Sequence, residues 1–142
     1  MRLFYKKGII TPKDDKTNIP LEFEVNGDFD IIRVSYSYYP KTVSNEETAL
    51  KTINEKMRQY DYTDYNAEDY LPVKNLVTLS FDDPLGYRGA CHRQPNEQKI
   101  IIGKNSTSGI ENRENPRGKW RIVLNVHYAG CNIDYEIGVS GE

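Results

Sequence analysis

The chain has 142 residues, 37% of them hydrophobic and 28% charged, a polar but globular composition that fits a single domain. Its formal net charge of −2 offers no basic field to attract a nucleic-acid backbone or an anionic membrane, so neither partner is expected. No apolar run reaches membrane-spanning length, and the N-terminal segment lacks the features of a signal peptide, so we expect a cytoplasmic protein.

Alternating apolar and polar residues predict strands in the first part of the chain. This alternation is typical of a half-buried strand, because successive side chains point to opposite faces of a sheet. The pattern is weak over 3–10 and clear over 21–25 and 32–38. An Asn-Gly-Asp turn at 26–28 separates the two clear segments, and we expect them to form a hairpin.

One helix is predicted over 44–60. It opens with the capping-box sequence from Ser44 to Glu47. We expect its apolar stripe to cover an edge or an open end of the sheets, in preference to forming a groove for a partner. The acidic, tyrosine-rich segment 61–70 has no apolar period and is predicted to be a loop. The apolar stripe of the predicted helix 44–60 consists of Leu50, Ile53, Met57 and Tyr60.

Strands return in the second part of the chain, over 77–81, 99–102, 120–126 and 133–139. The short connection between the last two predicts a second hairpin. The whole pattern predicts an all-β antiparallel sandwich over 1–142, jelly-roll-like, with one inserted amphipathic helix. Shared parity places six residues in one core, namely Trp120, Leu124, Val126, Ile133, Tyr135 and Ile137.

Cysteines and histidines are too few for a standard metal site. Cys91 and Cys131 lie 40 positions apart and are expected to be free thiols, although their spacing leaves a disulfide open. His92 and His127 are the only histidines, whereas hydrolytic metal sites commonly use several. A site combining them with Asp83 is the less favoured alternative. We expect no metal, no cofactor and no catalytic activity.

The most chemically concentrated segment is 82–93, which is predicted to be an ordered loop. Asp83, Arg88, His92 and Arg93 are its candidate binding residues, because guanidinium groups hold carboxylates and phosphates. The alternative, which we favour, is that Arg88 pairs with Asp83 and anchors the loop.

Tyrosines offer a second candidate surface. The residues concerned are Tyr36, Tyr38 and Tyr39 with the group at 60–70, which together could form an aromatic platform for a sugar or a peptide. Strand tyrosines commonly pack their rings and leave only the hydroxyl wet, so packing is the favoured interpretation.

Several segments together resemble a known family. They are FDDPLGYRGACHR at 81–93, PRGKW at 116–120 leading into LNVH at 124–127, and IPLEFEV at 19–25. The chain resembles, over nearly its whole length, the N-terminal domain of PHP-type metallohydrolases of the CehA/McbA kind, and D-P-x-G-x-R-G is the most specific part. The resemblance implies a β-sandwich that precedes a distorted α/β barrel, in which metal-binding histidines hydrolyse esters or phosphoesters.

The barrel is absent from this sequence, which ends about where a second domain would begin, so no catalytic residue of the family is carried over. We therefore expect a non-catalytic accessory or interaction domain of a PHP-type phosphoesterase or esterase. Its partner would be a PHP-type catalytic domain in cis or trans, with self-association left open. The alternative is a stand-alone β-sandwich that binds a glycan or a small anion. A concave, tyrosine-lined face would favour the alternative.

Overall fold

The structure, a computed structural model, describes residues 1–92 and 97–142. Within these ranges the chain forms eight strands, one α-helix and two short 3-10 turns. The helix α1 spans Glu46–Gln59, and the turns are η1 (Pro12–Asp14) and η2 (Ala67–Tyr70). The strands are β1 (Arg2–Ile10), β2 (Asn18–Val25), β3 (Ile31–Tyr39), β4 (Leu76–Asp83), β5 (Gly86–Cys91), β6 (Glu97–Gly103), β7 (Gly118–Tyr128) and β8 (Ile133–Gly141).

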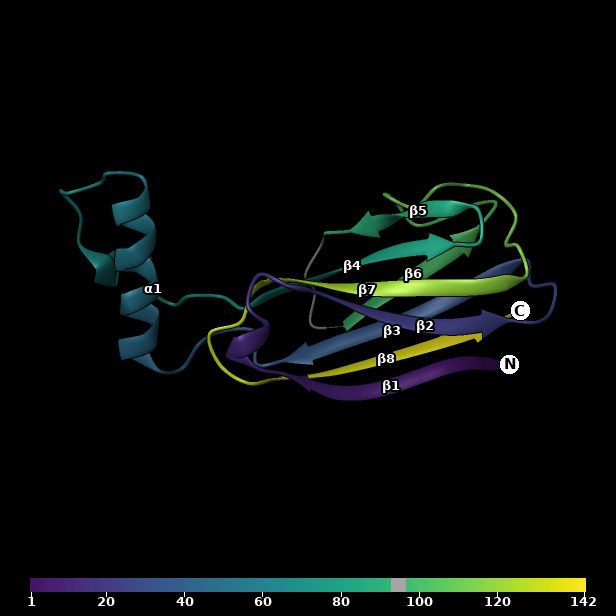
Figure 1. Ribbon diagram of the computed structural model, residues 1–142, viewed down its shortest axis with the longest axis horizontal. Coiled ribbons are helices and arrows are strands. Elements are labelled where there is room, and N and C mark those ends of the chain that lie inside the picture. Colours follow the sequence, from purple (N-terminus) through teal and green to yellow (C-terminus); the bar gives the residue numbers. More distant parts are fainter. Residues whose placement is uncertain (93–96) are drawn as a thin grey trace.

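The strands form two antiparallel four-stranded sheets that pack face to face (Figure 1). One sheet has the order β1-β8-β3-β6 and the other β2-β7-β4-β5. Consecutive strands change sheet at every connection except the one between β4 and β5, and this order is that of a jelly roll. The predicted all-β antiparallel sandwich with one inserted helix is confirmed.

Both predicted hairpins are wrong, because the strands of each belong to opposite sheets. β2 pairs with β7, whereas β3 pairs with β6 and β8, so residues 26–28 cross from one sheet to the other. Residues 129–132 make the same crossing between β7 and β8. A short polar turn can span the roughly 10 Å between packed sheets as well as reverse a strand, and the alternation on either side is the same in both cases.

Within the segment 82–93, residues 82–91 form the end of the first strand, the turn and the second strand of a hairpin where a loop was predicted. β4 runs to Asp83, two residues make the turn, and β5 starts at Gly86, whose φ is 115°. The sequence pattern did not predict β5, because its inward positions opposite Leu79 and Phe81 hold Cys91 and Gly89. These two residues give no alternation of large apolar side chains.

The inner faces of the two sheets share one core. The six residues predicted to point into it are all buried, which confirms that prediction. However, β7 and β8 face one another from opposite sheets and do not lie side by side. Burying an aliphatic side chain contributes about 1.5–3 kcal/mol, so this core is the main source of stability.

The helix projects from one end of the sandwich and does not cover an edge (Figure 1). Its N-cap is Asn45, one residue later than the capping box predicts, and the Asn45 side chain accepts a hydrogen bond from the Thr48 amide at 3.0 Å. The Thr52 hydroxyl lies 2.6 Å from the Tyr128 hydroxyl and ties the helix to the sandwich. No helix in the described ranges is long and apolar enough to cross a membrane.

The two segments at the base of the helix run antiparallel. Val43 donates its amide to the Val73 carbonyl at 2.8 Å, and Asn75 donates to the Lys41 carbonyl at 2.9 Å. We call residues 44–72 the arm. Within it Ala49 and Ile53 are buried, whereas Tyr60, the last residue of the predicted stripe, is exposed.

Candidate functional site

Asp83 and Arg88 form an ion pair inside the sandwich. An Arg88 Nη1 to Asp83 Oδ2 distance of 2.8 Å joins them, and neither side chain has any exposed surface. Arg113 Nη2 lies 2.9 Å from the same oxygen, and the Arg88 guanidinium lies 5.6 Å from the centre of the Trp120 ring. The predicted pair is therefore present, and each charge has the partner that burial requires.

Arg88 also holds the irregular segment 104–117 against β5. Its guanidinium donates to four backbone carbonyls, and its own carbonyl accepts from the Glu111 amide at 2.8 Å. Arg88 thus anchors the chain between β6 and β7. The prediction was that it anchors its own segment, 82–93. The four carbonyls belong to Gly103, Glu111, Arg113 and Glu114.

Three of the four predicted binding residues lie in the part of the chain that the structure describes. Asp83 and Arg88 have no solvent-exposed side-chain surface, and His92 is exposed beyond the end of β5. Arg93 lies outside the described residues. His127 Nε2 lies 2.9 Å from the Thr78 hydroxyl. Across the described ranges, no three His, Cys, Asp or Glu side chains are placed to hold a metal ion, and both cysteines are free thiols.

The tyrosines do not gather into one platform. Tyr36 and Tyr38 point into the core, where their hydroxyls donate to the carbonyls of Val77 and Asn75 at 3.0 and 3.3 Å. Burial raises the pKa of Tyr36. Tyr39, on the opposite face of β3, is 74% exposed. The other exposed tyrosines of the predicted platform lie on the arm, namely Tyr60, Tyr62 and Tyr70.

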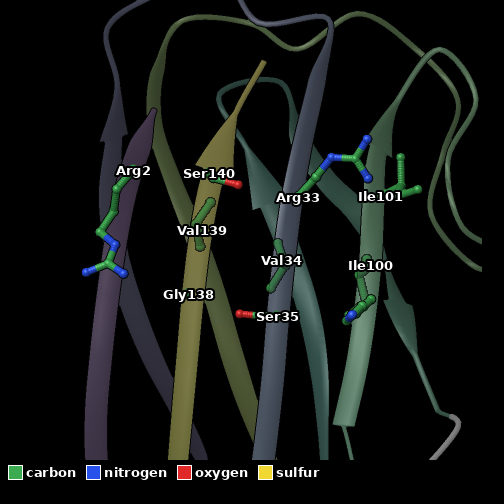
Figure 2. A pocket seen from close by; sticks show the side chains of 10 residues that line it. Arg2, Arg33, Val34, Ser35, Ile100, Ile101, Gly138, Val139 and Ser140 are labelled. Atoms are coloured by element: carbon green, nitrogen blue, oxygen red, sulfur yellow. The ribbon is translucent and has the colours of Figure 1, made fainter.

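A hollow of about 590 Å³ lies on the outer face of the β1-β8-β3-β6 sheet (Figure 2). The sequence did not predict it. Its floor is made by Ser35 and Gly138, which are cross-strand partners at the centre of the sheet. A Cβ on Gly138 would come within 2.9 Å of the Ser35 hydroxyl oxygen, so there is little room for a larger residue. The hollow exists because outward positions of the two central strands carry small residues.

Three cationic side chains surround this floor. Arg2 on β1 and Arg33 on β3 both lie across from Ser140, and Lys99 on β6 lies across from Ser35. Figure 2 shows the Arg2 side chain along β1 and the Arg33 side chain directed toward Ile101 on β6, with Ser140, Gly138 and Ser35 between them. We call Arg2, Arg33 and Lys99 with their serine and glycine floor the basic hollow.

One carboxylate stands at the rim of the basic hollow. Arg33 Nε donates to Glu142 Oε1 at 2.8 Å, and this hydrogen bond lowers the pKa of Glu142 and raises that of Arg33. Among the described side chains, no acidic group lies within ion-pair distance of Arg2 or Lys99. The basic hollow is therefore locally positive on a chain whose net charge is −2.

A second hollow of about 320 Å³ lies farther along the same face. There Ser37 is paired with Glu136 and Tyr39 with Asp134 across β3 and β8. Its chemistry differs from that of the basic hollow, since it combines two carboxylates and two lysines with an exposed aromatic ring. We call it the tyrosine hollow, and around it lie Lys7, Ser37, Tyr39, Lys41, Asp134 and Glu136.

The sequence matches no protein-family model, and a search of curated proteins gives no match either. The resemblance to the N-terminal domain of PHP-type metallohydrolases therefore stays a prediction.

Proposed function

We propose that this chain is a non-catalytic binding module whose basic hollow takes a small anion or the anionic group of a glycan. The observation that carries the proposal is that Arg2, Arg33 and Lys99 all line one hollow of about 590 Å³ with a floor of small residues. Concave sites with a few converging polar groups are typical of ligand binding, and guanidinium groups recognise carboxylates and sulfates through paired hydrogen bonds.

Arg33 is the residue best placed to bind such a group. It already holds a carboxylate, because its Nε and Nη2 contact Glu142 at 2.8 and 3.5 Å. Both partners are about half exposed, and a surface ion pair of this kind contributes only about 0–1 kcal/mol. A ligand carboxylate or sulfate can therefore replace Glu142 at little cost.

Titration of the ¹⁵N-labelled chain with glucuronate and with sulfate tests this function. We expect amide shifts at Ser35 and Gly138 that saturate, and we expect Arg33→Ala to abolish them. Arg121→Ala is the matched control, because Arg121 on the outer face of the other sheet is 46% exposed against 47% for Arg33 and also pairs with a glutamate. Equal loss in both variants would point to net charge alone and contradict the proposal.

The arm supports a second candidate, an accessory domain that positions a PHP-type phosphoesterase or esterase domain in cis or trans. Its exposed tyrosines, Tyr60, Tyr62 and Tyr70, are of a type enriched at protein interfaces. Sedimentation of the chain alone and with such a catalytic domain tests this candidate. A complex that is lost in the Tyr60→Ser, Tyr62→Ser variant would support it, and the absence of any complex would contradict it.

A further inference from the structure

We propose that the ligand of this face is an oligosaccharide that lies along β3 and β8, with an acidic sugar residue over the basic hollow and neutral sugar rings over the tyrosine hollow. The inference rests on the proposed function, because it assigns a ligand class to the same face. The inference adds the length of the ligand, the hollow over which each of its ends lies, and the position of its acidic group.

The distance between the two hollows sets the length of the ligand. Ser35 and Gly138 form the floor of the basic hollow, and Tyr39 and Asp134 are paired in the tyrosine hollow. These pairs lie four residues apart on each strand, or about 13 Å at roughly 3.3 Å per residue. A single sugar ring is too short to contact both hollows, whereas an oligosaccharide spans them.

The charges on the face set the direction. Three cations line the basic hollow, and only one of them, Arg33, is paired with a carboxylate, that of Glu142. At the tyrosine hollow two carboxylates, Asp134 and Glu136, are balanced by Lys7 and Lys41, so an acidic group finds no excess of positive charge there, whereas neutral hydroxyl groups can donate hydrogen bonds to both carboxylates. The acidic sugar residue is therefore placed over the basic hollow and the neutral rings over the tyrosine hollow.

Two exposed tyrosines lie along this path, and Tyr39 supplies the more open ring, because the Arg2 guanidinium lies 5.0 Å from the centre of the Tyr5 ring. Tyr39 stands beside Asp134, and Tyr5 on β1 lies across from Gly138 at the basic hollow. The Tyr5 hydroxyl donates to Glu136 at 2.7 Å, so its ring is held in place between the two hollows. A rigid aromatic ring loses little entropy on binding, and it can cover the C–H face of a sugar.

A peptide fits this face less well than a saccharide. Peptides commonly bind sheets by adding a strand to an exposed edge, where backbone groups are unpaired. Here the floors of both hollows lie on β8 and β3, the two central strands, whose edges are already paired with neighbours. The polar groups that remain are side-chain hydroxyls, carboxylates and cations, which suit the hydroxyl groups of a sugar.

Calorimetric titration with matched oligosaccharides tests the inference. The probes are xylo-, gluco- and galacto-oligosaccharides of four rings, each neutral or with one terminal ring replaced by a uronate, together with glucuronate alone. We expect at least one acid-bearing oligosaccharide to bind about tenfold more tightly than its neutral counterpart, which is the difference that a charge-assisted hydrogen bond makes. We expect it also to bind about three- to tenfold more tightly than glucuronate, because glucuronate lacks the rings over the tyrosine hollow.

Two variants with matched controls locate the ligand. Tyr39→Ala is expected to weaken the oligosaccharide about three- to tenfold and to leave glucuronate unchanged. Tyr87→Ala, which removes an exposed tyrosine from the other sheet, should change neither. Arg33→Ala should weaken both ligands, and Arg121→Ala should weaken neither.

The outcomes separate this inference from the proposed function. Glucuronate binding with no gain from any oligosaccharide would overturn the inference and leave the proposed function standing. Neutral oligosaccharides that bind as tightly as acid-bearing ones would also overturn it. The absence of binding by every probe would overturn both. Self-association that is lost in Arg33→Ala, without glycan binding, would show that a second copy occupies the face and would overturn the inference.

Discussion

Two arginines show how the surroundings of a side chain decide its role. Arg88 has no exposed surface, and its N–H groups are directed to Asp83 and to backbone carbonyls. Arg33 is half exposed and is bonded to one carboxylate at the rim of a hollow. The first arrangement stabilises the fold, because a buried charge needs its partners, and the second leaves a cation accessible to a ligand.

Arg88→Ala is expected to lower the free energy of unfolding by about 3–5 kcal/mol, because it leaves Asp83 buried and uncompensated on one side. Urea unfolding followed by Trp120 fluorescence measures the change. Arg121→Ala is the control, since it removes an exposed ion pair with Glu22 and should cost about 0–1 kcal/mol. A loss for Arg88→Ala no larger than that of the control would show that the buried pair does not stabilise the fold.

The pair of Asp83 and Arg88 could be predicted from sequence because the two residues are five positions apart and oppositely charged. The basic hollow could not, because Arg2, Arg33 and Lys99 come from three strands that are distant in the sequence. The available signal was weak: Ser35, Gly138 and Ser140 are small residues at outward strand positions, where longer polar side chains are common. Only the register of β3 and β8 brings them together.

At the scale of elements, the segment 104–117 protects the exposed edge of β5. Ala90 donates its amide to the Gly109 carbonyl at 3.1 Å, and Gly89 forms an isolated bridge with Ile110. β5 is the last strand of its sheet, so without this cover its backbone groups would be open to other strands. The close approach depends on Gly89, where a Cβ would clash with the Gly109 carbonyl oxygen.

Gly89→Ala is expected to destabilise the protein far more than Gly86→Ala. Both glycines have positive φ values, 140° and 115°, so each substitution strains the backbone by about 1–2 kcal/mol. Only at Gly89 does the new methyl group meet backbone, whereas nothing lies within 4 Å of the corresponding position at Gly86. Thermal unfolding of the two variants gives the comparison. Equal losses would show that the segment can move away from β5 at no cost.

Strand positions could be predicted from the sequence better than strand pairings. Alternation identifies a strand with one buried face, and five of the described strands carry it clearly, whereas 3–10 carries it weakly and 99–102 is a short apolar run. Alternation says nothing about which sheet a strand joins, so the turns at 26–28 and 129–132 were interpreted as hairpins although they cross between sheets. β5 lacks the pattern because Cys91 and Gly89 take inward positions.

At the scale of the whole molecule, the sandwich and the arm are separable in structure. The buried residues of the arm, Ala49 and Ile53, are not part of the core between the sheets. At the base of the arm, Thr42 and Lys74 form an antiparallel bridge, and Val43 donates its amide to the Val73 carbonyl. The two base segments are therefore already placed as the two sides of a hairpin, so a tight turn can join them.

Replacement of residues 44–72 by Asn-Gly is expected to leave the sandwich folded. Val43 and Val73 would flank a two-residue turn, for which Asn-Gly is the preferred sequence. The variant loses the hydrogen bond between Thr52 and Tyr128 and uncovers part of Val43, so we expect a loss below about 3 kcal/mol, the full value of burying a valine.

Urea unfolding measures this loss, and the glucuronate titration shows whether the basic hollow is intact. Leu124→Ala provides the comparison, since a buried leucine truncated to alanine costs about 2–5 kcal/mol. If the arm serves a catalytic domain, its removal should abolish that complex and leave anion binding unchanged, because the basic hollow lies on the sheet and not on the arm. An unfolded variant, or one that no longer binds glucuronate, would show that the arm and the sandwich depend on each other.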